Sequence, residues 1–569
     1  MMLKNLRKFL LANKSVTLIV LAGTLIWSTT MVKSGIIYDY GMGFWGPNGH
    51  DGVWHIALAN SLARGSLDMP VFSGASIKNY HIGYDLLLAG LSRVTHIPTV
   101  NLYFQILPIL TALLVGIFTY KFVNKWRNNK TDVAWALFFV FFGGSFGWIV
   151  TMLRSGQIGG ESLFWSQQAI STLLNPPYAV SLIVLLLAMY FVFLAKPTTQ
   201  NAVLGIVLFG VLIQIKVYAG ILGLGGLLIA GVYELIICKK RRLAVIFLGA
   251  LMLALMLFIP LNRSSSETVV VRPLWFVETM MLFSDRLGWQ RYGEAMINYQ
   301  LAGNLIKGIP AYIIATVIFV TGNMGIRFMS VFWVINKARN IKKIGSIDIF
   351  LTAIILGGIV APLIFLQKGT PWNTIQFLYY SLFFSSIIAG IVISGILDIK
   401  KIRFKSVIAA GVIMFTLPTT LGTLPHYLPN RPPAKISMLE LEALGILLSQ
   451  QDGIVLSLPY DDEIKKVFSE PPLPLYVYES TAYVSAFSSK TSFLEDEVNL
   501  EITQYDWKQR RDDIERYLYS DMNGFSEYLH ENNICYLYLV KEERFENIAR
   551  TVADLLYENE EVAIYKVTP

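Results

Sequence analysis

The chain has 569 residues, of which 54% are hydrophobic and only 15% are charged, and its mean hydropathy of +0.52 excludes an ordinary soluble protein. Its net charge of +8 is unevenly divided: from residue 424 onward 13 Lys and Arg face 26 Asp and Glu, a balance of −13, so the preceding part carries +21. This division predicts a basic membrane part with an acidic, water-soluble tail, and it argues against nucleic-acid binding. Cys238 and Cys535 fall in a membrane segment and in the tail, which excludes a disulfide framework and a cysteine metal site.

Repeated apolar runs of about 20 residues, each long enough to cross a bilayer core, predict a multi-pass membrane protein. The first run, 15–32, follows a basic start and is long enough to remain as an anchor, with no cleavable signal peptide evident. Eleven helices are expected, at 15–33, 101–121, 132–153, 177–195, 201–216, 218–237, 243–261, 309–335, 347–366, 374–397 and 406–423.

Positive charge between these helices predicts their orientation. Clusters of Lys and Arg begin at residues 121, 239, 336 and 400, and such clusters favour the cytoplasmic side. We therefore expect a cytoplasmic N-terminus and about eleven crossings. The lack of disulfides and the Lys- and Ile-rich composition favour a prokaryotic plasma membrane. The segments 34–100, 154–176, 262–308, 367–373 and everything after 424 are then outside. The helix count is open by about one, because 201–237 could be a single long span.

The first outer loop, 34–100, carries the strongest functional pattern. In GHDGVWHIALANSLARG (49–65), Asp51 and His55 share one face if the run is helical, beside an apolar stripe. The stripe consists of Trp54, Ala57, Leu58 and Leu62. It predicts a helix along a membrane surface, with an acid and an imidazole at the water boundary.

An echo of this pattern follows at 79–98, NYHIGYDLLLAGLSRVTHIP, where His81 and Asp85 also share a helical face. Structural explanations stay open for both stretches. Asp51 could serve as the N-cap of a helix that starts at residue 52 or 53. His81 and Asp85 could form a purely structural pair, and His50 and His55 could be ordinary polar residues.

Basic and aromatic residues mark the other outer segments. The loop 262–308 contains Arg263, Arg272 and Arg291, which could bind phosphate or pair with Glu267, Glu278, Asp285 and Glu294. Lys216 interrupts an apolar stretch, where an ionisable group faces a cavity or snorkels to the surface. The short segment at 367–380 adds Lys368, Trp372 and Gln376, and its aromatic residues could also belong to an interfacial belt.

The sequence pattern of the tail predicts a small α/β domain. A turn-rich linker at 424–435 precedes the domain at 436–569. Strands are expected at 453–458, 481–486, 534–540 and 561–567, with helices at 515–533 and 541–560. The tail contains no glycine-rich phosphate loop, no GxSxG motif and no HExxH motif.

These features together resemble the GT-C superfamily of polytopic membrane glycosyltransferases, including the dolichyl-phosphate-mannose protein mannosyltransferases. HDGVWHIALANSLARG is similar to the family's acidic residue, often followed by a His, ahead of a helix that ends in Ala-Arg-Gly. NYHIGYDLLLAGLSRV is similar to the next family block. The resemblance implies an α-helical polytopic domain over residues 1–423 and an extracytoplasmic C-terminal domain.

The resemblance also implies an activity: transfer of a sugar from a polyprenyl-phosphate-linked donor to a glycan, lipid or protein acceptor on the outer face. Asp51 would be the general base, with His55 as its catalytic partner. The leaving phosphate needs cations, with Lys368 and Arg272 the first choices. Other donor and acceptor contacts would come from His81, Asp85, Lys216, Arg263, Arg291, Trp372 and Gln376. Because Gly52 follows Asp51 where the family often has a second acid, a requirement for a divalent cation stays open.

Two other functions remain possible from the sequence. A transporter or flippase of lipid-linked glycans would explain the many helices, although the hydropathy shows no inverted repeat and the charges gather in outer loops. A non-catalytic cell-surface assembly protein would use only the tail. A transferase needs the carboxylate of Asp51, whereas a transporter should tolerate Asp51→Asn.

Overall fold

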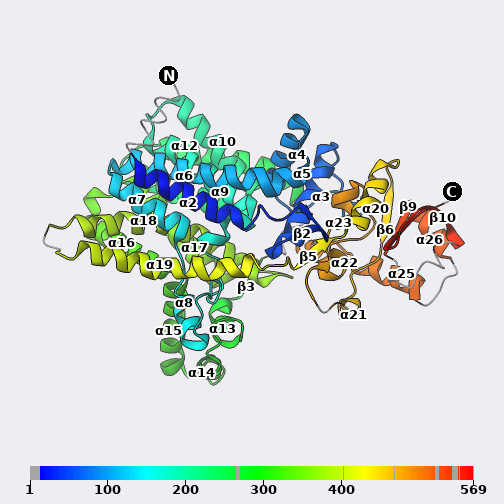
Figure 1. The fold of residues 1–569 in the computed structure, drawn as a ribbon. Helices are drawn as coiled ribbons and strands as arrows, with labels where there is room; N and C mark the ends of the chain where they lie inside the picture. The colour runs from blue at the N-terminus through cyan, green and yellow to red at the C-terminus, as the bar shows by residue number, and fades with distance from the viewer. Residues whose placement is uncertain are drawn as a thin grey trace. The chain divides into compact units, whose positions relative to one another are not determined.

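The computed structural model describes residues 13–263, 269–400, 403–466, 468, 470–519, 524–540, 549 and 551–567 (Figure 1). The chain forms two compact units. The helical unit comprises Met1–Thr29, Ile109–Pro260 and Ser265–His426. The loop–tail unit comprises Thr30–Pro108, Leu261–Ser264 and Tyr427–Pro569. The first outer loop therefore folds with the C-terminal tail, far away in sequence.

Helices at all eleven expected positions are present in the structure. They are α2 (Lys14–Thr29), α5–η2–α6 (Thr99–Asn101, Leu102–Ile106, Leu107–Arg127), α7 (Lys130–Phe142) with α8 (Gly147–Ser155), α9–η4 (Pro176–Met189, Tyr190–Leu194), α10 (Thr199–Ile215), α11 (Val217–Ile236), α12–η5 (Arg242–Phe258, Ile259–Leu261), α15–η7–α16 (Leu305–Met324, Gly325–Met329, Ser330–Arg339), α17 (Ser346–Ile364), η9–α18 (Pro371–Ile375, Gln376–Asp398) and α19 (Lys405–Tyr427).

Eight of these helices, among the described residues, are long and apolar enough to cross a membrane, or nine if the bent pair α7 and α8 is one span. This pair bends by 50° after Gly143, whose extended backbone ends α7. The count falls below the expected eleven because α2 and α10 have only 16 and 17 residues. The chain is thus a multi-pass membrane protein. An extended residue, Lys216, separates α10 from α11, so 201–237 is not one helix.

The core of the helical unit is built around α18, which is buried along most of its length. α18 carries no charged residue before Asp398, as expected for a helix with neighbours on most sides. α2 is attached to α7 by the Trp27 indole, which donates a 2.9 Å hydrogen bond to the Phe141 carbonyl. The two side chains also pack at a ring-centroid distance of 4.8 Å.

The predicted outer loop 262–308 contains a strand and two helices, namely β3 (Val269–Val271), α13 (Trp275–Leu282) and α14 (Gln290–Leu301). β3 pairs antiparallel with β4 (Phe365–Gln367). α13 and α14 pack against α15 through a core that includes Phe276, Met280, Met296 and Phe319. Remaining short segments of this unit are η3 (Ala169–Leu174) and η8 (Ile341–Lys343).

In the loop–tail unit, a four-stranded sheet joins the loop to the tail. Its order is β1-β2-β5-β7, and β2 of the loop pairs antiparallel with β5 of the tail, Phe44 opposite Ala434. The bounds are β1 (Ile36–Tyr38), β2 (Gly41–Phe44), β5 (Ala434–Ile436) and β7 (Leu473–Pro474), and the loop continues through η1 (Gly46–Gly49), α3 (Asp51–Ala63) and α4 (Gly83–Thr95). This sheet holds the start of α3 against the tail.

The tail itself contains a mixed five-stranded sheet of order β10-β11-β9-β6-β8, in which β8, β6 and β9 are parallel. These are β6 (Ile454–Ser457), β8 (Thr491–Ser492), β9 (Ile534–Val540), β10 (Ala553–Glu558) and β11 (Val562–Val567). The helices are α20 (Met438–Ser449), α21 (Asp462–Lys465), α22 (Leu475–Tyr478), α23 (Tyr483–Ser488), α24 (Glu497–Thr503), α25 (Lys508–Tyr519) and α26 (Phe525–Glu531). The predicted helical membrane fold with a small α/β tail is confirmed.

Two predicted elements of the tail are wrong in type. The expected strand at 481–486 is mostly helix, because Tyr483–Ser488 form α23, which is buried between other elements. The expected helix at 541–560 ends in a strand, because Ala553–Glu558 pair with β11 across a short turn. Residues 541–548 and 550 of that prediction lie outside the described residues. In both cases contacts with distant parts of the chain outweigh local propensity: helix packing for α23 and strand pairing for β10.

Candidate active site

The helix α3 begins at Asp51 itself, one residue earlier than expected, and His50 is the residue before it. Asp51 therefore lies in the first turn, where the helix dipole favours a carboxylate, and does not occupy the cap position. Close packing explains the glycine at position 52, because a Cβ there would lie 2.6 Å from the Phe104 ring. The residue after Asp51 must be small, which accounts for the absence of a second acid there.

Most of α3 is buried, and this differs from the expected helix along a membrane surface. Every residue from Gly52 to Ala59 is buried, because α4 and α23 pack against the helix. The side chain of Asp51, by contrast, is 55% exposed. The structure thus presents one carboxylate at the end of an otherwise enclosed helix.

Three ionisable side chains form a cluster at this point, which we call the Asp51–His50–Asp496 cluster. Nδ1 of His50 lies 3.0 Å from Oδ1 of Asp51, and Nε2 lies 3.3 Å from Oδ1 of Asp496. His50 is nearly buried and Asp496 is fully buried. Asp496 is itself fixed, because it caps α24 and accepts hydrogen bonds from the backbone and side chain of Asn499.

The charges of this cluster follow from its geometry. Burial alone would lower the pKa of His50, but the carboxylates of Asp496 and Asp51 outweigh it and raise that pKa well above 6.5. An imidazolium between two carboxylates leaves a net charge of about −1 on the cluster. The imidazolium fixes the orientation of the Asp51 carboxylate.

His55 lies one turn after Asp51 but does not share its exposure. Its Nδ1 lies 2.6 Å from Oδ1 of Asp85, which is fully buried. The imidazole stacks on Tyr103 at 5.7 Å and meets the edge of Tyr84 at 5.6 Å. The helix periodicity of α3 is as predicted, but the face that holds His55 points into the core of the loop–tail unit.

His81 precedes α4, which begins at Gly83. Its ring packs on Tyr80 at 4.7 Å, and Tyr80 meets Trp54 of α3 edge to face at 5.5 Å. Burial raises the pKa of Tyr80 well above 10, and Asp85 adds to the effect. The structure therefore brings His81, Asp85 and His55 into one aromatic neighbourhood beside the Asp51 end of α3.

Among the predicted cations, Arg263 is in the same compact unit as Asp51. It is exposed, and two residues before it the Leu261 carbonyl accepts a 2.6 Å hydrogen bond from the backbone N–H of Asn79. No ion pair of Arg263 occurs among the residues that the structure describes. Its suggested partner Glu267 lies outside them.

The remaining cations belong to the helical unit. Arg272 pairs with Glu278 at 3.7 Å. Arg272 and Lys368 lie at opposite ends of the paired strands β3 and β4, because each directly follows the last residue of its own antiparallel strand. Arg291 is exposed on α14. Lys216 is buried, with its ammonium 5.6 Å from the centre of the Tyr218 ring.

Lys216 and Lys368 are linked through their neighbours. The Tyr218 hydroxyl donates a 3.4 Å hydrogen bond to Gln367, the residue before Lys368. Trp372 is 51% exposed in η9. Gln376 begins α18 and accepts a 3.1 Å hydrogen bond from Asn175.

Two residues of evident importance were not predicted. Asp496 sits in the acidic run LEDEVN, whose fold next to His50 depends on contacts between distant parts of the chain. Arg327 is an arginine inside an apolar run, a signal that sequence inspection could have used. It is fully enclosed and donates to the carbonyls of Met324, Asn323 and Gly144 and to the Gln168 side chain.

The cluster offers no nitrogen ligand for a metal ion. Both nitrogens of His50 face carboxylates, so the ring offers no lone pair to a cation. In the described part of the chain, no group of three or more His, Cys, Asp or Glu side chains is placed to hold a metal ion.

Comparison with known proteins gives the fold. No family model matches the sequence, and no curated protein matches it. The oligosaccharyltransferase AglB from Archaeoglobus fulgidus, in complex with an inhibitory peptide and a dolichol-phosphate, superposes with a TM-score of 0.50 at 10% identity, covering 93% of this chain and 69% of that chain. The same organism's oligosaccharyltransferase in complex with Zn and sulfate gives 0.52 at 10% identity, over 92% and 68%.

The arabinofuranosyltransferase AftD from Mycobacteria gives a TM-score of 0.50 at 12% identity, covering 98% of this chain but 40% of that one. At such low identities the likeness concerns the fold alone. The chain has the fold of the GT-C superfamily of membrane glycosyltransferases, as the sequence resemblance predicted.

Proposed function

We propose that the chain is a membrane glycosyltransferase that moves a sugar from a polyprenyl-phosphate-linked donor to a hydroxyl group of a glycan, lipid or protein acceptor. The observation that carries this proposal is the exposed carboxylate of Asp51, held by the buried imidazole of His50 in a chain with the GT-C fold. The dolichol-phosphate bound to AglB supports the class of donor. We place the reaction on the outer face of the plasma membrane, with the N-terminus cytoplasmic.

In the proposed reaction the acceptor oxygen attacks the anomeric carbon while its proton passes to Asp51. The bond between the anomeric carbon and the phosphate oxygen breaks, and its electron pair leaves with the lipid phosphate. A new bond joins the acceptor oxygen to the sugar. General base catalysis of this kind contributes about 10²- to 10⁴-fold to the rate.

The other residues of the cluster support this role by position. The His50 imidazolium holds one oxygen of Asp51, and Asp496 keeps that imidazolium charged and in place. The His55–Asp85 hydrogen bond fixes the next turn of α3 against α4. We assign His50, Asp496, His55 and Asp85 as positioning residues and Asp51 as the catalytic residue.

The leaving phosphate requires positive charge. Arg263 is our first candidate, because it is exposed, belongs to the unit of Asp51 and forms no ion pair among the described residues. Lys368 and Lys216 are the next, linked through Tyr218 and Gln367. Arg272 ranks lower because Glu278 already balances its charge.

The test is sugar transfer by the full-length protein in liposomes, with a panel of polyprenyl-phosphate sugars and with hydroxylated acceptors. We expect release of the lipid phosphate together with a glycosylated product. Movement of a lipid-linked sugar across the bilayer without product would instead support a flippase. If no donor in the panel gives either a glycosylated product or movement across the bilayer, the proposal is contradicted.

A further inference from the structure

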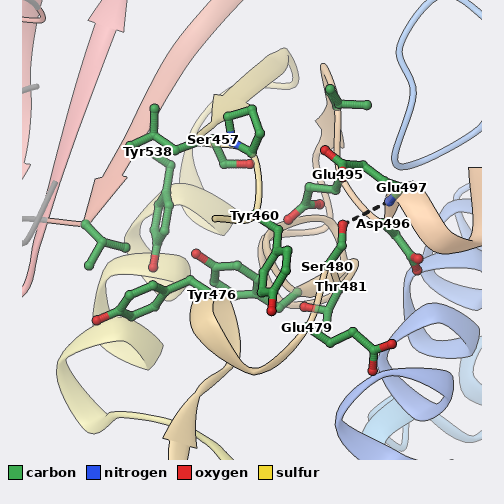
Figure 2. Close-up of a pocket in the computed structure, with 15 residues that line it drawn as sticks. Ser457, Tyr460, Tyr476, Glu479, Ser480, Thr481, Glu495, Asp496, Glu497 and Tyr538 are labelled. Atoms are coloured by element: carbon green, nitrogen blue, oxygen red, sulfur yellow. Dashed lines mark hydrogen bonds between the residues drawn. The ribbon is translucent and has the colours of Figure 1, made fainter. Parts of the chain in front are cut away.

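The cavities of the structure differ greatly in size. The tail pocket, whose wall includes Ser457, Tyr460 and Asp496 (Figure 2), has a volume of about 30 Å³, which is room for one or two water molecules. A cavity in the helical unit has a volume of about 660 Å³, within the range of sites that bind small organic molecules. The second cavity is therefore large enough for an organic ligand.

This larger cavity, which we call the α15 groove, lies between α13, α14 and α15, three helices that pack on one another (Figure 1). Leu305, Ile309, Ile313 and Val317 of α15 line it and recur every four residues, so they form one apolar stripe. Each of these side chains is more than half exposed. At about 1.5 Å per residue the stripe is about 18 Å long, a little more than half of a bilayer core of about 30 Å. The stripe thus has the length of a lipid chain that fills one leaflet.

Charged and polar side chains line the α15 groove as well. Arg272 precedes α13 and Glu278 lies on it, and Nη2 of Arg272 is 3.7 Å from Oε2 of Glu278. This separation is longer than a hydrogen bond, so both groups retain hydrogen-bonding capacity for a ligand. The Arg272 side chain is 62% exposed and the Glu278 side chain 12% exposed. The exposed carboxamides of Gln300 and Asn304 line the same cavity and add further donors.

The charges of the groove favour a headgroup that carries both signs. Of the described residues that line the groove, Arg272 and Glu278 are the charged ones, and their charges cancel. A headgroup with only a negative charge is attracted by Arg272 but repelled by Glu278. A phosphodiester joined to an amine matches both, because its phosphate accepts from the guanidinium and its ammonium donates to the carboxylate. The Tyr312 hydroxyl donates a 2.7 Å hydrogen bond to Oε1 of Glu278, which fixes this carboxylate at the groove.

We propose that the α15 groove binds one chain of a zwitterionic phospholipid, a phosphatidylethanolamine, with its phosphate at Arg272 and its ammonium at Glu278. The chain itself gives little selectivity, because the surrounding bilayer is as apolar as the stripe. Selectivity therefore comes from the paired charges. The bound lipid fills the space between α13, α14 and α15 and becomes part of the packing of the helical unit. This inference does not depend on sugar transfer.

The first test is native mass spectrometry of the full-length protein, delipidated in detergent and titrated with phosphatidylethanolamine and phosphatidylglycerol of identical chains. We expect a Kd at least fivefold lower for phosphatidylethanolamine. Glu278→Gln leaves Arg272 unbalanced, so it should bind phosphatidylglycerol at least as tightly as phosphatidylethanolamine, and its amide oxygen still accepts from Tyr312. Glu294→Gln, which removes an exposed carboxylate of α14 outside the groove, is the matched control and should keep the wild-type preference.

The second test locates the chain through Gly308, which lines the groove. A Cβ at this position would lie 3.6 Å from the Cβ of Tyr299, an ordinary contact, so Gly308→Ala fits and is the matched control. Gly308→Leu extends a larger side chain into the groove and should raise the Kd for phosphatidylethanolamine at least fivefold. In liposomes of the same lipid, a phosphatidylethanolamine with a diazirine on its chain should crosslink to α15 of the wild type and of Gly308→Ala, but not of Gly308→Leu.

Equal Kd values of the two lipids for the wild type, or an unchanged preference in Glu278→Gln, would overturn the proposal. Equal binding and crosslinking by Gly308→Ala and Gly308→Leu would also overturn it. Crosslinks that a polyprenyl phosphate displaces and unlabelled phosphatidylethanolamine does not would assign the groove to the donor instead. Because Glu278→Gln preserves the side-chain volume, its result stands even if Gly308→Leu lowers the unfolding temperature.

Discussion

Nε2 of His50 lies 3.3 Å from Oδ1 of Asp496, which joins the start of the first loop helix to the acidic run of the tail. One carboxylate of this arrangement, Asp51, is exposed, and the other is completely buried. A buried charge persists only when it is paired. The tail is therefore part of the proposed active site through the imidazole that orients the base.

Asp496→Asn should reduce kcat by about tenfold, the effect of losing one charge-assisted hydrogen bond of about 1.4 kcal/mol. Because Asp496 raises the pKa of His50, the variant should also lose activity at a lower pH than the wild type. The measurement is the pH profile of sugar transfer. Asp461→Asn, which removes a carboxylate charge of the tail but keeps the oxygen that caps α21, is the matched control. Equal pH profiles for wild type and Asp496→Asn would contradict the assigned role.

Removal of the Asp85 carboxylate should destabilise the loop–tail unit strongly. Asp85 is fully buried and bonds His55 at 2.6 Å, and breaking a buried pair costs about 3 kcal/mol or more. We expect Asp85→Ala to lower the thermal unfolding temperature clearly, and the exposed Asp68→Ala to change it little. Similar unfolding temperatures for both variants would show that the pair does not hold α3 on α4.

The tail should lose stability as the pH rises. Burial raises the pKa of Glu495 to about 7 from its ordinary 4.5. Its stabilising contribution is therefore complete below pH 4.5 and is lost as the pH rises through about 7. The raised pKa of His50 acts in the same direction, and its stabilising contribution begins to be lost above pH 6.5.

The thermal unfolding temperature, measured between pH 5 and pH 8, tests the predicted fall in stability. The wild type should unfold at lower temperature at pH 8, and Glu495→Gln should show a smaller difference between the two pH values. Glu442→Gln, at an exposed position of α20, should behave like the wild type. A wild type that is more stable at pH 8 than at pH 5 would contradict the account.

Arg263→Gln should raise the KM for the lipid-linked donor by about tenfold and leave the KM for the acceptor unchanged. A guanidinium bound to phosphate contributes about 1.5 kcal/mol or more through charge-assisted hydrogen bonds. Arg93→Gln changes another exposed arginine, on α4 of the same unit, and should have no effect. An unchanged donor KM in Arg263→Gln would move the phosphate site to Lys368 and Lys216.

The sequence was sufficient for the features that depend on local pattern. The apolar runs and the helix after Asp51 were predicted from the residues and are confirmed. The GT-C fold was implied by the family resemblance and is also confirmed. Hydrophobic length and helix periodicity are properties of short stretches, so neighbours in sequence suffice to recognise them.

The features that depend on distant contacts were missed. Asp496 meets His50 where loop and tail pack together, through the pairing of β2 with β5 and the packing of α3 on α23. His55 and Asp51 share the periodicity of one helix, yet burial by α4 and α23 separates their environments. Likewise, β10 forms because β11 is available to pair with it.

The most direct measurement is the kcat of sugar transfer by Asp51→Asn, beside Asp39→Asn, which changes another exposed aspartate of the same loop. Both proteins should unfold at the temperature of the wild type. We predict a fall in kcat of about 10² or more for Asp51→Asn and none for Asp39→Asn. Equal rates for wild type and Asp51→Asn would show that Asp51 is not the base.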